Sequence, residues 1–354
     1  MAAWAWGRRC LAVAALAGLL VAGCAGDDGD AGDTASDPTD APAPRDGDLR
    51  LVSLNLLHGI LCTDDDHCDA PNRVELLARH LEAARCPDVV ALQEISPWMH
   101  DLVRERAETL CGGRYEIVFP EIDQTYLDVE MVLTGLPATD ARREVLAQGF
   151  RRALRVTLES GMGPVDLVVT HTGPAAGSDS MGGGPLCGAG RQACPPPCDP
   201  DGTIFACQIT QVAELLDRRP TEDRAAGVLV GDLNLVPEAP SVLSLLHRGW
   251  VDSYVEAGNP ACDPATSTGC TGGRDDASLA SLQDPTSRER ERIDYALVSP
   301  GACPPRFDAP DDGDGDGLGT GLFADEPATD APGGLAWPSD HVGVALDVSC
   351  RPGT

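Results

Sequence analysis

The chain has 354 residues, a formal net charge of −30 and a pI near 4.3. This acidity excludes the broad basic surface by which proteins bind nucleic acid tightly. It does not exclude turnover of a phosphate ester, because salt screens exposed charges over roughly 8 Å and a metal-filled cleft can still admit a phosphate.

Residues 1–23 have the order of a secretory signal peptide. Arg8 and Arg9 precede an apolar run over residues 11–21, which is too short to span a bilayer as a permanent helix. Small residues then lead to Cys24, as in a bacterial lipobox. The alternative is an ordinary signal peptide cut nearby, with Cys24 as a spare thiol. The lipobox predicts an exported lipoprotein on the cell surface or in the periplasm, anchored to the membrane by acyl chains on Cys24.

Residues 24–47 follow as an acidic tether. They are largely Asp, Gly, Ala, Thr and Pro, with no large apolar side chain. Such a segment buries too little apolar surface to offset its ordering entropy. The sequence therefore predicts a disordered tether that leads to a catalytic domain over residues 48–351.

The domain opens with a strand, helix, strand, helix order. Residues 49–56 alternate into a strand, and Pro71 begins an amphipathic helix that Cys86-Pro87 stops. A strand over 88–94 and a helix over 98–110 follow. Shorter strands are predicted over residues 115–119, 129–134, 150–158 and 165–171. This order predicts an α/β (α+β) fold, a four-layer α/β/β/α sandwich in which two mixed sheets pack face to face with flanking helices.

A Cys-rich insertion over residues 172–207 opens the second half. It follows directly after His171 and is rich in Gly and Pro, so we expect a pinned loop that shapes the substrate rim. Helices are predicted over residues 209–218 and 239–246, strands over 227–234 and 292–299, and loops over 259–284 and 308–330.

The 14 cysteines are typical of an exported, disulfide-bonded protein. Setting aside Cys10 and Cys24 leaves an even number. The predicted pairs are Cys62–Cys68, Cys86–Cys111, Cys262–Cys270 and Cys303–Cys350. The remaining four lie in the insertion and are Cys187, Cys194, Cys198 and Cys207. They either pair with one another or hold zinc, and the lack of a histidine among them favours disulfides.

An acidic segment within residues 308–330 has the alternating acids of a calcium loop, at Asp312, Asp314 and Asp316. Phe323 stands at the twelfth position, where a calcium loop has glutamate, and no helical pattern flanks the segment. A solvated acidic loop is therefore favoured over a structural Ca²⁺ site, which stays open as the alternative.

Polar landmarks recur where the predicted buried strands end. In chain order they are Asn55, Gln93-Glu94, His171, Asp232 and Asn234 of Gly-Asp-Leu-Asn, Asp294, and Ser339-Asp340-His341. Singly, each has a structural explanation, such as a turn cap or a strand end. Together, strand ends that carry acids, amides and imidazoles describe the rim of an active site.

In this order, the landmarks resemble the endonuclease/exonuclease/phosphatase superfamily, which has the deoxyribonuclease I fold. The resemblance covers roughly residues 48–350. It implies a hydrolase of phosphate esters that depends on Mg²⁺ or Mn²⁺. The implied metal site contains Glu94, with Asn55 beside it and Asp340 joining the shell. A single carboxylate with waters suits Mg²⁺, which keeps much of its hydration.

The resemblance also implies five catalytic residues, which are His171, Asp232, Asn234, Asp294 and His341. Asp232 would orient or deprotonate a water that Asn234 fixes. His341, oriented and kept protonated by Asp294, would donate to the scissile phosphate, and His171 would donate from another side.

Two further residues lie near the predicted rim. Glu130 is a candidate partner for a histidine. Arg152 either contacts phosphate or forms a surface ion pair.

The substrate stays open at this stage. A phosphodiester of nucleic acid or of a phospholipid head group fits the implied site, and we expect a monomeric extracellular nuclease. The alternatives are a sphingomyelinase-like phospholipid phosphodiesterase and a small-molecule phosphatase. A surface-binding lipoprotein on an inert scaffold is the non-enzyme alternative. The sequence contains no evident apolar hairpin for membrane entry and no aromatic-plus-basic cluster for stacking bases.

Overall fold

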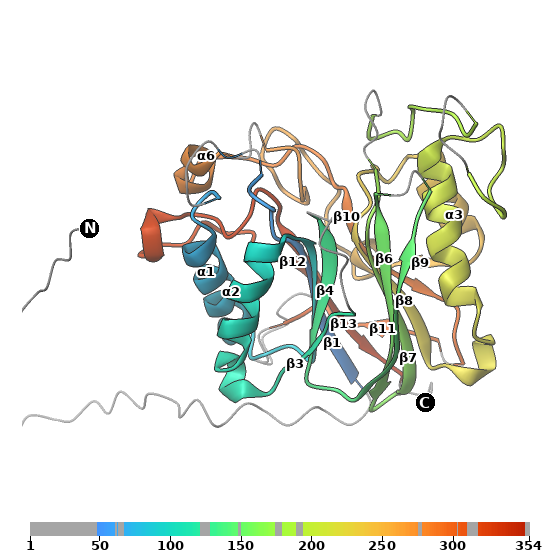
Figure 1. The fold of residues 1–354 in the computed structure, drawn as a ribbon, viewed down its shortest axis with the longest axis horizontal. Coiled ribbons are helices and arrows are strands. Elements are labelled where there is room, and N and C mark those ends of the chain that lie inside the picture. Colours follow the sequence, from blue (N-terminus) through green and yellow to red (C-terminus); the bar gives the residue numbers. More distant parts are fainter. Residues whose placement is uncertain are drawn as a thin grey trace, which may run out of the picture. The chain divides into compact units, whose positions relative to one another are not determined.

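In the computed structural model, two β-sheets pack face to face and helices cover their outer faces (Figure 1). The described residues are 48–350 except 61, 63–66, 121–127, 148–149, 174–178, 189–193, 275–277, 303 and 310–317. They all belong to one compact unit, Pro38–Thr354. The predicted signal peptide, Cys24 and the tether lie outside the described residues.

The first sheet has the order β11-β13-β1-β2-β4-β3, with β12 also paired to β13. Its strands are β1 (Asp48–Asn55), β2 (Val89–Ile95), β3 (Glu116–Val118), β4 (Val129–Thr134), β11 (Arg306–Phe307), β12 (Gly321–Phe323) and β13 (Gly343–Ser349). β1 and β2 are parallel, and Asn55 lies opposite Gln93. The carboxyl ends of these two strands therefore meet at one edge, which brings Asn55 beside Glu94.

The second sheet has the order β5-β6-β7-β8-β10-β9. Its strands are β5 (Ala138–Val145), β6 (Arg152–Ser160), β7 (Gly163–His171), β8 (Ala226–Asp232), β9 (Val251–Asp252) and β10 (Asp294–Ser299). β7 and β8 are parallel and end together, with His171 opposite Asp232. β10 runs antiparallel to β8, so its first residue, Asp294, also lies opposite Asp232.

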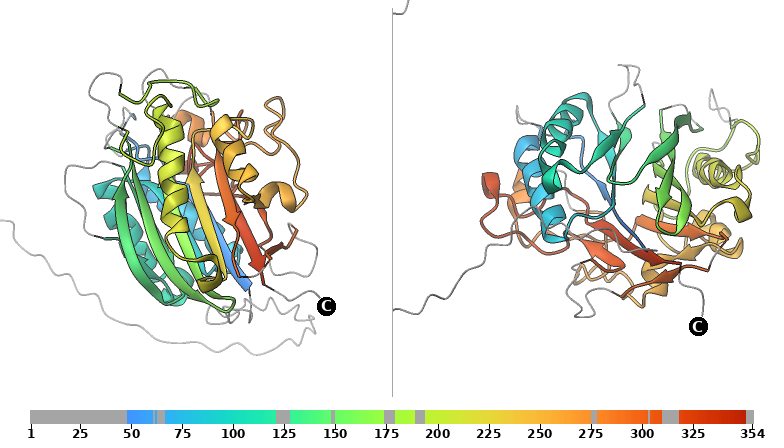
Figure 2. Two further views of the ribbon diagram at one scale, coloured as in Figure 1. Left: turned by 90° about the vertical axis from the view of Figure 1, so that its right-hand side faces the viewer. Right: turned by 90° about the horizontal axis from the view of Figure 1, so that it is seen from below.

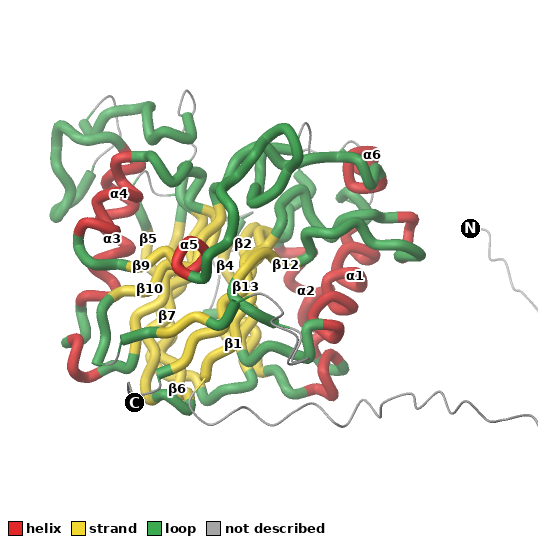
Figure 3. Tube along the Cα trace, turned by 180° about the vertical axis from the view of Figure 1, so that it is seen from behind, coloured by secondary structure: helices red, strands yellow, loops and turns green. Residues whose placement is uncertain are grey.

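The core between the sheets follows from the two-residue period of the strands. Leu49 and Leu51 of β1 face the second sheet, whereas Val52 and Leu54 face the helices. α1 (Ala70–Ala83) and α2 (Pro97–Ala107) cover the first sheet, and α3 (Ile204–Asp217) and α4 (Pro240–His247) cover the second. Figures 2 and 3 show the strands between these two helical layers. The predicted four-layer sandwich is confirmed.

Several elements differ from the sequence prediction. α3 begins inside the predicted insertion, because Thr203 caps it by accepting from the amide of Ala206. β5 was not predicted because it is a polar, largely exposed edge strand. β13 was not predicted either, since Asp347 interrupts its apolar run, yet it pairs with β1 inside the first sheet.

The remaining short elements lie in stretches for which no element was predicted or a loop was expected. They are α5 (Ser253–Glu256), α6 (Leu279–Gln283), β9, β11 and β12, and the 3₁₀ helices Leu110–Gly113, Thr221–Asp223 and Pro332–Gly334. No helix in the described ranges is long and apolar enough to cross a membrane.

The disulfides follow the sequence prediction where the structure describes them. The predicted pairs Cys62–Cys68, Cys86–Cys111 and Cys262–Cys270 are present. The four cysteines of the insertion form Cys187–Cys194 and Cys198–Cys207, so they do not offer the free thiolates that zinc requires. The predicted Cys303–Cys350 pair cannot be followed, because Cys303 lies outside the described residues.

Candidate active site

Asn55 joins the two sheets at the edge where their polar strand ends meet. Its amide nitrogen lies 3.1 Å from Glu94 Oε1, on the first sheet, and 3.1 Å from Asp232 Oδ2, on the second. Its amide oxygen accepts from the backbone of Leu57 at 3.1 Å. One fully buried amide thus fixes a carboxylate of each sheet at the centre of the site.

Glu94, Asp128 and His171 form the first cluster, here called the Glu94 cluster. One ligand atom from each lies within 4.8 Å of the others. His171 Nδ1 is 3.7 Å from Glu94 Oε1 and 3.4 Å from Asp128 Oδ2. This arrangement concentrates two carboxylates and one imidazole in a small, largely buried volume.

The backbone of Glu94 is unusual for a strand residue. Its φ of 60° lies in the left-handed region, where the pairing of β2 with β4 shifts register. That conformation is strained for a residue other than glycine and persists only where its surroundings hold it. The amide of His58 does so in part, because it donates to Glu94 Oε2 at 2.8 Å.

Arg151, which the sequence analysis did not select, supplies the positive charge of the Glu94 cluster. Its guanidinium pairs with Asp128 and lies 2.8 Å from His171 Nδ1. A guanidinium only donates, so Nδ1 of a neutral His171 accepts and the ring proton sits on Nε2, which lies 3.4 Å from Asp232 Oδ2. Protonation of Nδ1 would require Arg151 to move away.

The charges of the cluster follow from these contacts. Burial and the charge of Arg151 oppose protonation of His171, but Asp128 and Asp232 outweigh them and raise its pKa. Burial opposes ionisation of Asp128, yet His171 and Arg151 hold its pKa below the usual range. Burial and the nearby charge of Asp128 raise the pKa of Glu130 to about 8, which favours its neutral form at pH 7.

Asp232, Asp294 and His341 form the second cluster, here called the His341 cluster. His341 Nδ1 lies 2.9 Å from Asp294 Oδ2, and its Nε2 lies 3.8 Å from Asp232 Oδ2. Burial alone would lower the pKa of His341, but the charge and hydrogen bond of Asp294 raise it well above its ordinary value. Burial, together with the charge of Asp294, raises the pKa of Asp232.

Local contacts explain the conformation of the Gly-Asp-Leu-Asn turn. Gly231 has a φ of 130°, and a Cβ there would lie 1.9 Å from the carbonyl oxygen of Thr170, so only glycine fits. Asn234 has a φ of 52° and donates from its backbone to Asp232 Oδ1 at 2.7 Å. Its side chain donates to Thr172 at 3.1 Å, which ties the turn to the loop after β7.

Ser339 connects the C-terminal motif to the rest of the site. Its hydroxyl donates to the carbonyl of Asn55 and accepts from the amide of His341. Asp340 belongs to neither cluster, and its Oδ1 lies 3.3 Å from the Ser339 hydroxyl.

The remaining candidates lie beside the site or outside the described residues. Arg152 is buried rather than on the surface, and its guanidinium donates to the carbonyl of Arg151. The predicted calcium residues Asp312, Asp314 and Asp316 lie outside the described residues.

Asp128 was missed although a weak signal marks it. It stands two residues before Glu130, so the strand alternation places both acids toward one face if it continues past the start of β4. Arg151 had no comparable signal, because nothing local distinguishes it from Arg152.

The donors of the Glu94 cluster fit a divalent cation. Carboxylate oxygens suit Mg²⁺ and Mn²⁺, whereas an imidazole suits later transition metals better. Among the described residues, Asp128 Oδ1 is buried without a hydrogen-bond partner, as expected of a carboxylate oxygen that binds a cation. Glu94 and Asp128 would hold the ion, and His171 would lie beside it.

A model of the Endonuclease/Exonuclease/phosphatase family matches residues 52–341, and the chain belongs to this family. The resemblance inferred from the polar landmarks is therefore confirmed. Members are hydrolases that act on phosphate ester bonds, and they commonly use divalent metal ions. The chain is thus a phosphate ester hydrolase of this family.

Solved structures share the fold at low sequence identity. The crystal structure of D. rerio TDP2 complexed with single strand DNA product is 18% identical, covers 85% of this chain and 99% of that one, and has a TM-score of 0.59. An endonuclease/exonuclease/phosphatase from Bacteroides vulgatus is 13% identical, with coverages of 86% and 99% and a TM-score of 0.56. Truncated Caenorhabditis elegans TDP2 is 15% identical, with coverages of 85% and 97% and a TM-score of 0.54. No curated protein sequence matches the chain.

Proposed function

We propose that the protein is an exported, Mg²⁺- or Mn²⁺-dependent phosphodiesterase whose substrate is nucleic acid. The observation that carries the proposal is the bridge made by Asn55, which places a cluster suited to a cation next to a histidine–aspartate pair. Phosphodiester hydrolysis needs charge neutralisation, an aimed water and a donor to the phosphate, and the two clusters together supply all three.

The residues of the His341 cluster would carry the proton chemistry. Asp232 is held on both oxygens, by Asn234 and Asn55, and its raised pKa makes it a better base for an attacking water. The Nδ1–H of a protonated His341 donates to Asp294 Oδ2, which leaves its Nε2–H to donate to a phosphate oxygen. A divalent cation held by Glu94 and Asp128 would supply charge neutralisation of the phosphoryl group.

Nucleic acid is the substrate that the comparisons favour. D. rerio TDP2 was solved with a single strand DNA product on the same fold. The net charge of −30 argues for turnover at a local site rather than for tight binding along a basic surface.

A phospholipid phosphodiester is the second candidate, and two exposed apolar side chains favour it. Phe150 is 45% exposed and directly precedes Arg151. Ile60 is 39% exposed, and its amide donates to the ring of His58, which lies beside Glu94. Apolar side chains beside the site would contact a bilayer whose head groups enter it.

Export and membrane attachment belong to the same proposal. The disulfides of the described residues support a compartment outside the cytosol. Lipid attachment at Cys24 would hold the protein, as a monomer, on the cell surface or in the periplasm.

The test compares substrates on the purified chain from residue 24 onward, with Cys24 changed to Ser to avoid lipidation. Supercoiled DNA, RNA, sphingomyelin vesicles and bis-p-nitrophenyl phosphate are each supplied with Mg²⁺, Mn²⁺ or EDTA, beside a His341→Ala variant. We expect metal-dependent cleavage of DNA or RNA that the variant lacks. Cleavage of sphingomyelin alone would replace the nucleic acid proposal by the lipid one, and no turnover of any substrate would refute the phosphodiesterase.

A further inference from the structure

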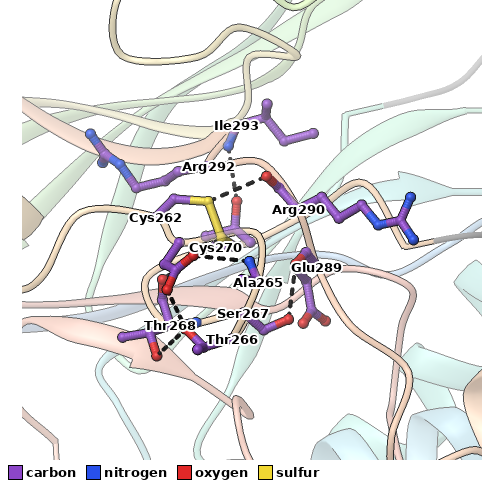
Figure 4. Close-up of a disulfide and its surroundings, with 12 residues drawn as sticks. Cys262, Ala265, Thr266, Ser267, Thr268, Cys270, Glu289, Arg290, Arg292 and Ile293 are labelled. Atoms are coloured by element: carbon purple, nitrogen blue, oxygen red, sulfur yellow. Dashed lines mark hydrogen bonds between the residues drawn. A yellow bond between two sulfur atoms is a disulfide. The ribbon is translucent and has the colours of Figure 1, made fainter.

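A disulfide-closed loop lies against the segment that leads into β10 (Figure 4). Cys262 and Cys270 close the loop. The hydroxyl of Ser267 donates to the carbonyl of Glu289 at 2.9 Å, and the sulfur of Cys262 lies 3.4 Å from the carbonyl oxygen of Arg290. The loop is thereby attached to the chain a few residues before Asp294.

Thr271, the residue after the disulfide, is bonded to the backbone beside both members of the histidine–aspartate pair. Its hydroxyl accepts from the amides of Ile293 and Asp294, each at 3.0 Å. Its carbonyl accepts from the amide of Val342, next to His341, at 2.8 Å. Thr271 is completely buried, so water does not compete for these bonds.

Gly272, the next residue, packs directly against the imidazole of His341. A Cβ on Gly272 would lie 3.1 Å from His341 Cε1 and 2.7 Å from Ile293 Cδ1, so the ring lies close against bare backbone. The amides of Thr271 and Gly272 both donate to the carbonyl of Glu291, which keeps this backbone in place. The ring of His341 is therefore bounded by Asp294 at Nδ1 and by Gly272 at Cε1.

We propose that Thr271 is a positioning residue for the His341–Asp294 pair, and that the Cys262–Cys270 loop holds Thr271 in place. Within the described ranges, Asp294 Oδ1 is buried without a hydrogen-bond partner, so the bond to His341 and the backbone of Asp294 do most to fix that carboxylate. The Thr271 hydroxyl fixes this backbone. The inference rests on the proposed function through the role of His341.

The first test replaces the hydroxyl without changing the volume of the side chain. Thr271→Val removes the acceptor for the amides of Ile293 and Asp294, and Thr271→Ser keeps it. We expect Val to lower kcat by about 10- to 100-fold with little change in KM, because a small misplacement of a catalytic group acts on the transition state. Ser should restore most of kcat, and the alkaline limb of the pH profile should move in Val but not in Ser.

The second test removes the support of Thr271. A variant with Cys262→Ser and Cys270→Ser should lower kcat severalfold and move the alkaline limb in the same direction. The matched control changes Cys86 and Cys111 to Ser, since that disulfide joins the end of α1 to the neighbouring 3₁₀ helix on the outer side of the first sheet. The control should retain kcat below its melting temperature.

The outcomes separate this inference from the proposed function. An inactive His341→Ala beside a Thr271→Val with wild-type kcat and pH profile would overturn the positioning role alone. A fully active His341→Ala would overturn the proposed function instead. If Thr271→Val does not fold, the cysteine variant decides, and a kcat equal to that of its Cys86/Cys111 control would overturn the inference.

Discussion

The two clusters of the site differ in how they are held together. In the His341 cluster, Asp294 and the imidazole share a hydrogen bond of 2.9 Å, and Thr271 fixes the backbone beside both. In the Glu94 cluster, the carboxylates of Glu94 and Asp128 both lie near Nδ1 of His171, and Arg151 pairs with Asp128. The His341 cluster is complete within the chain, whereas the Glu94 cluster gains from an added cation.

The His341 cluster is therefore organised by hydrogen bonds, and the Glu94 cluster by the balance of charges. Hydrogen bonds with buried backbone fix the orientation of the residues that they hold, so the His341 cluster is organised before substrate binds. Two carboxylates in one small volume repel each other, so the Glu94 cluster depends on the cations near it. Variants of the His341 cluster should therefore change catalysis and its pH dependence, and variants of the Glu94 cluster should change metal dependence.

The largest expected effect is that of His341→Ala. Loss of the donor should reduce kcat by about 10²- to 10⁴-fold, the usual contribution of a positioned acid or base. Hydrolysis of bis-p-nitrophenyl phosphate with saturating Mg²⁺ measures it, and circular dichroism checks the fold. Extra metal should not rescue this variant, and rescue would contradict the separation of the two clusters.

Changes in the Glu94 cluster should act on metal affinity instead. Asp128→Asn should raise the Mg²⁺ or Mn²⁺ concentration needed for half-maximal activity by about 10- to 100-fold. EDTA should abolish activity of the wild type, and added metal should restore it. A titration of activity against Mn²⁺ gives the measurement, and an unchanged midpoint would remove Asp128 from the metal site.

The pH dependence should report the His341 cluster. Asp294 raises the pKa of His341, so the protonated ring is present below that pKa and is lost as the pH rises through it. Asp294→Asn removes the charge and should move the alkaline limb of kcat to lower pH. A limb that stays in place in this variant would mean that another group titrates.

The smallest expected effect is a change in melting temperature with Arg151→Gln. Without a bound cation, Asp128 would lose the guanidinium that pairs with it, and the melting temperature should fall by a few degrees, as for a loss of about 1 kcal/mol. Added Mn²⁺ should then raise the melting temperature more than in the wild type, because the ion replaces the lost charge. Thermal melts with and without Mn²⁺ test this, with exposed Arg104→Gln as the control. Equal metal-induced shifts in both variants would show that Arg151 does not balance Asp128.

The sequence predicted the His341 cluster better than the Glu94 cluster for a physical reason. Asp232 and Asp294 lie in strands with clear apolar patterns, and His341 ends a short motif, so local signals mark all three. Asp128 directly precedes β4 after residues that follow no regular pattern, and Arg151 stands just before β6. Neither position carries a periodic signal of its own.

By itself, the sequence determined the strands that carry the site, the order of its polar residues and three of the disulfides. These depend on local rules, such as the two-residue period of a strand and the short spacing between most of the paired cysteines. Only the tertiary structure decided that Asn55 joins both sheets, that Arg151 balances Asp128, and that Thr271 supports the His341–Asp294 pair. Those contacts join distant segments, and the packing of the two sheets brings them within hydrogen-bonding distance.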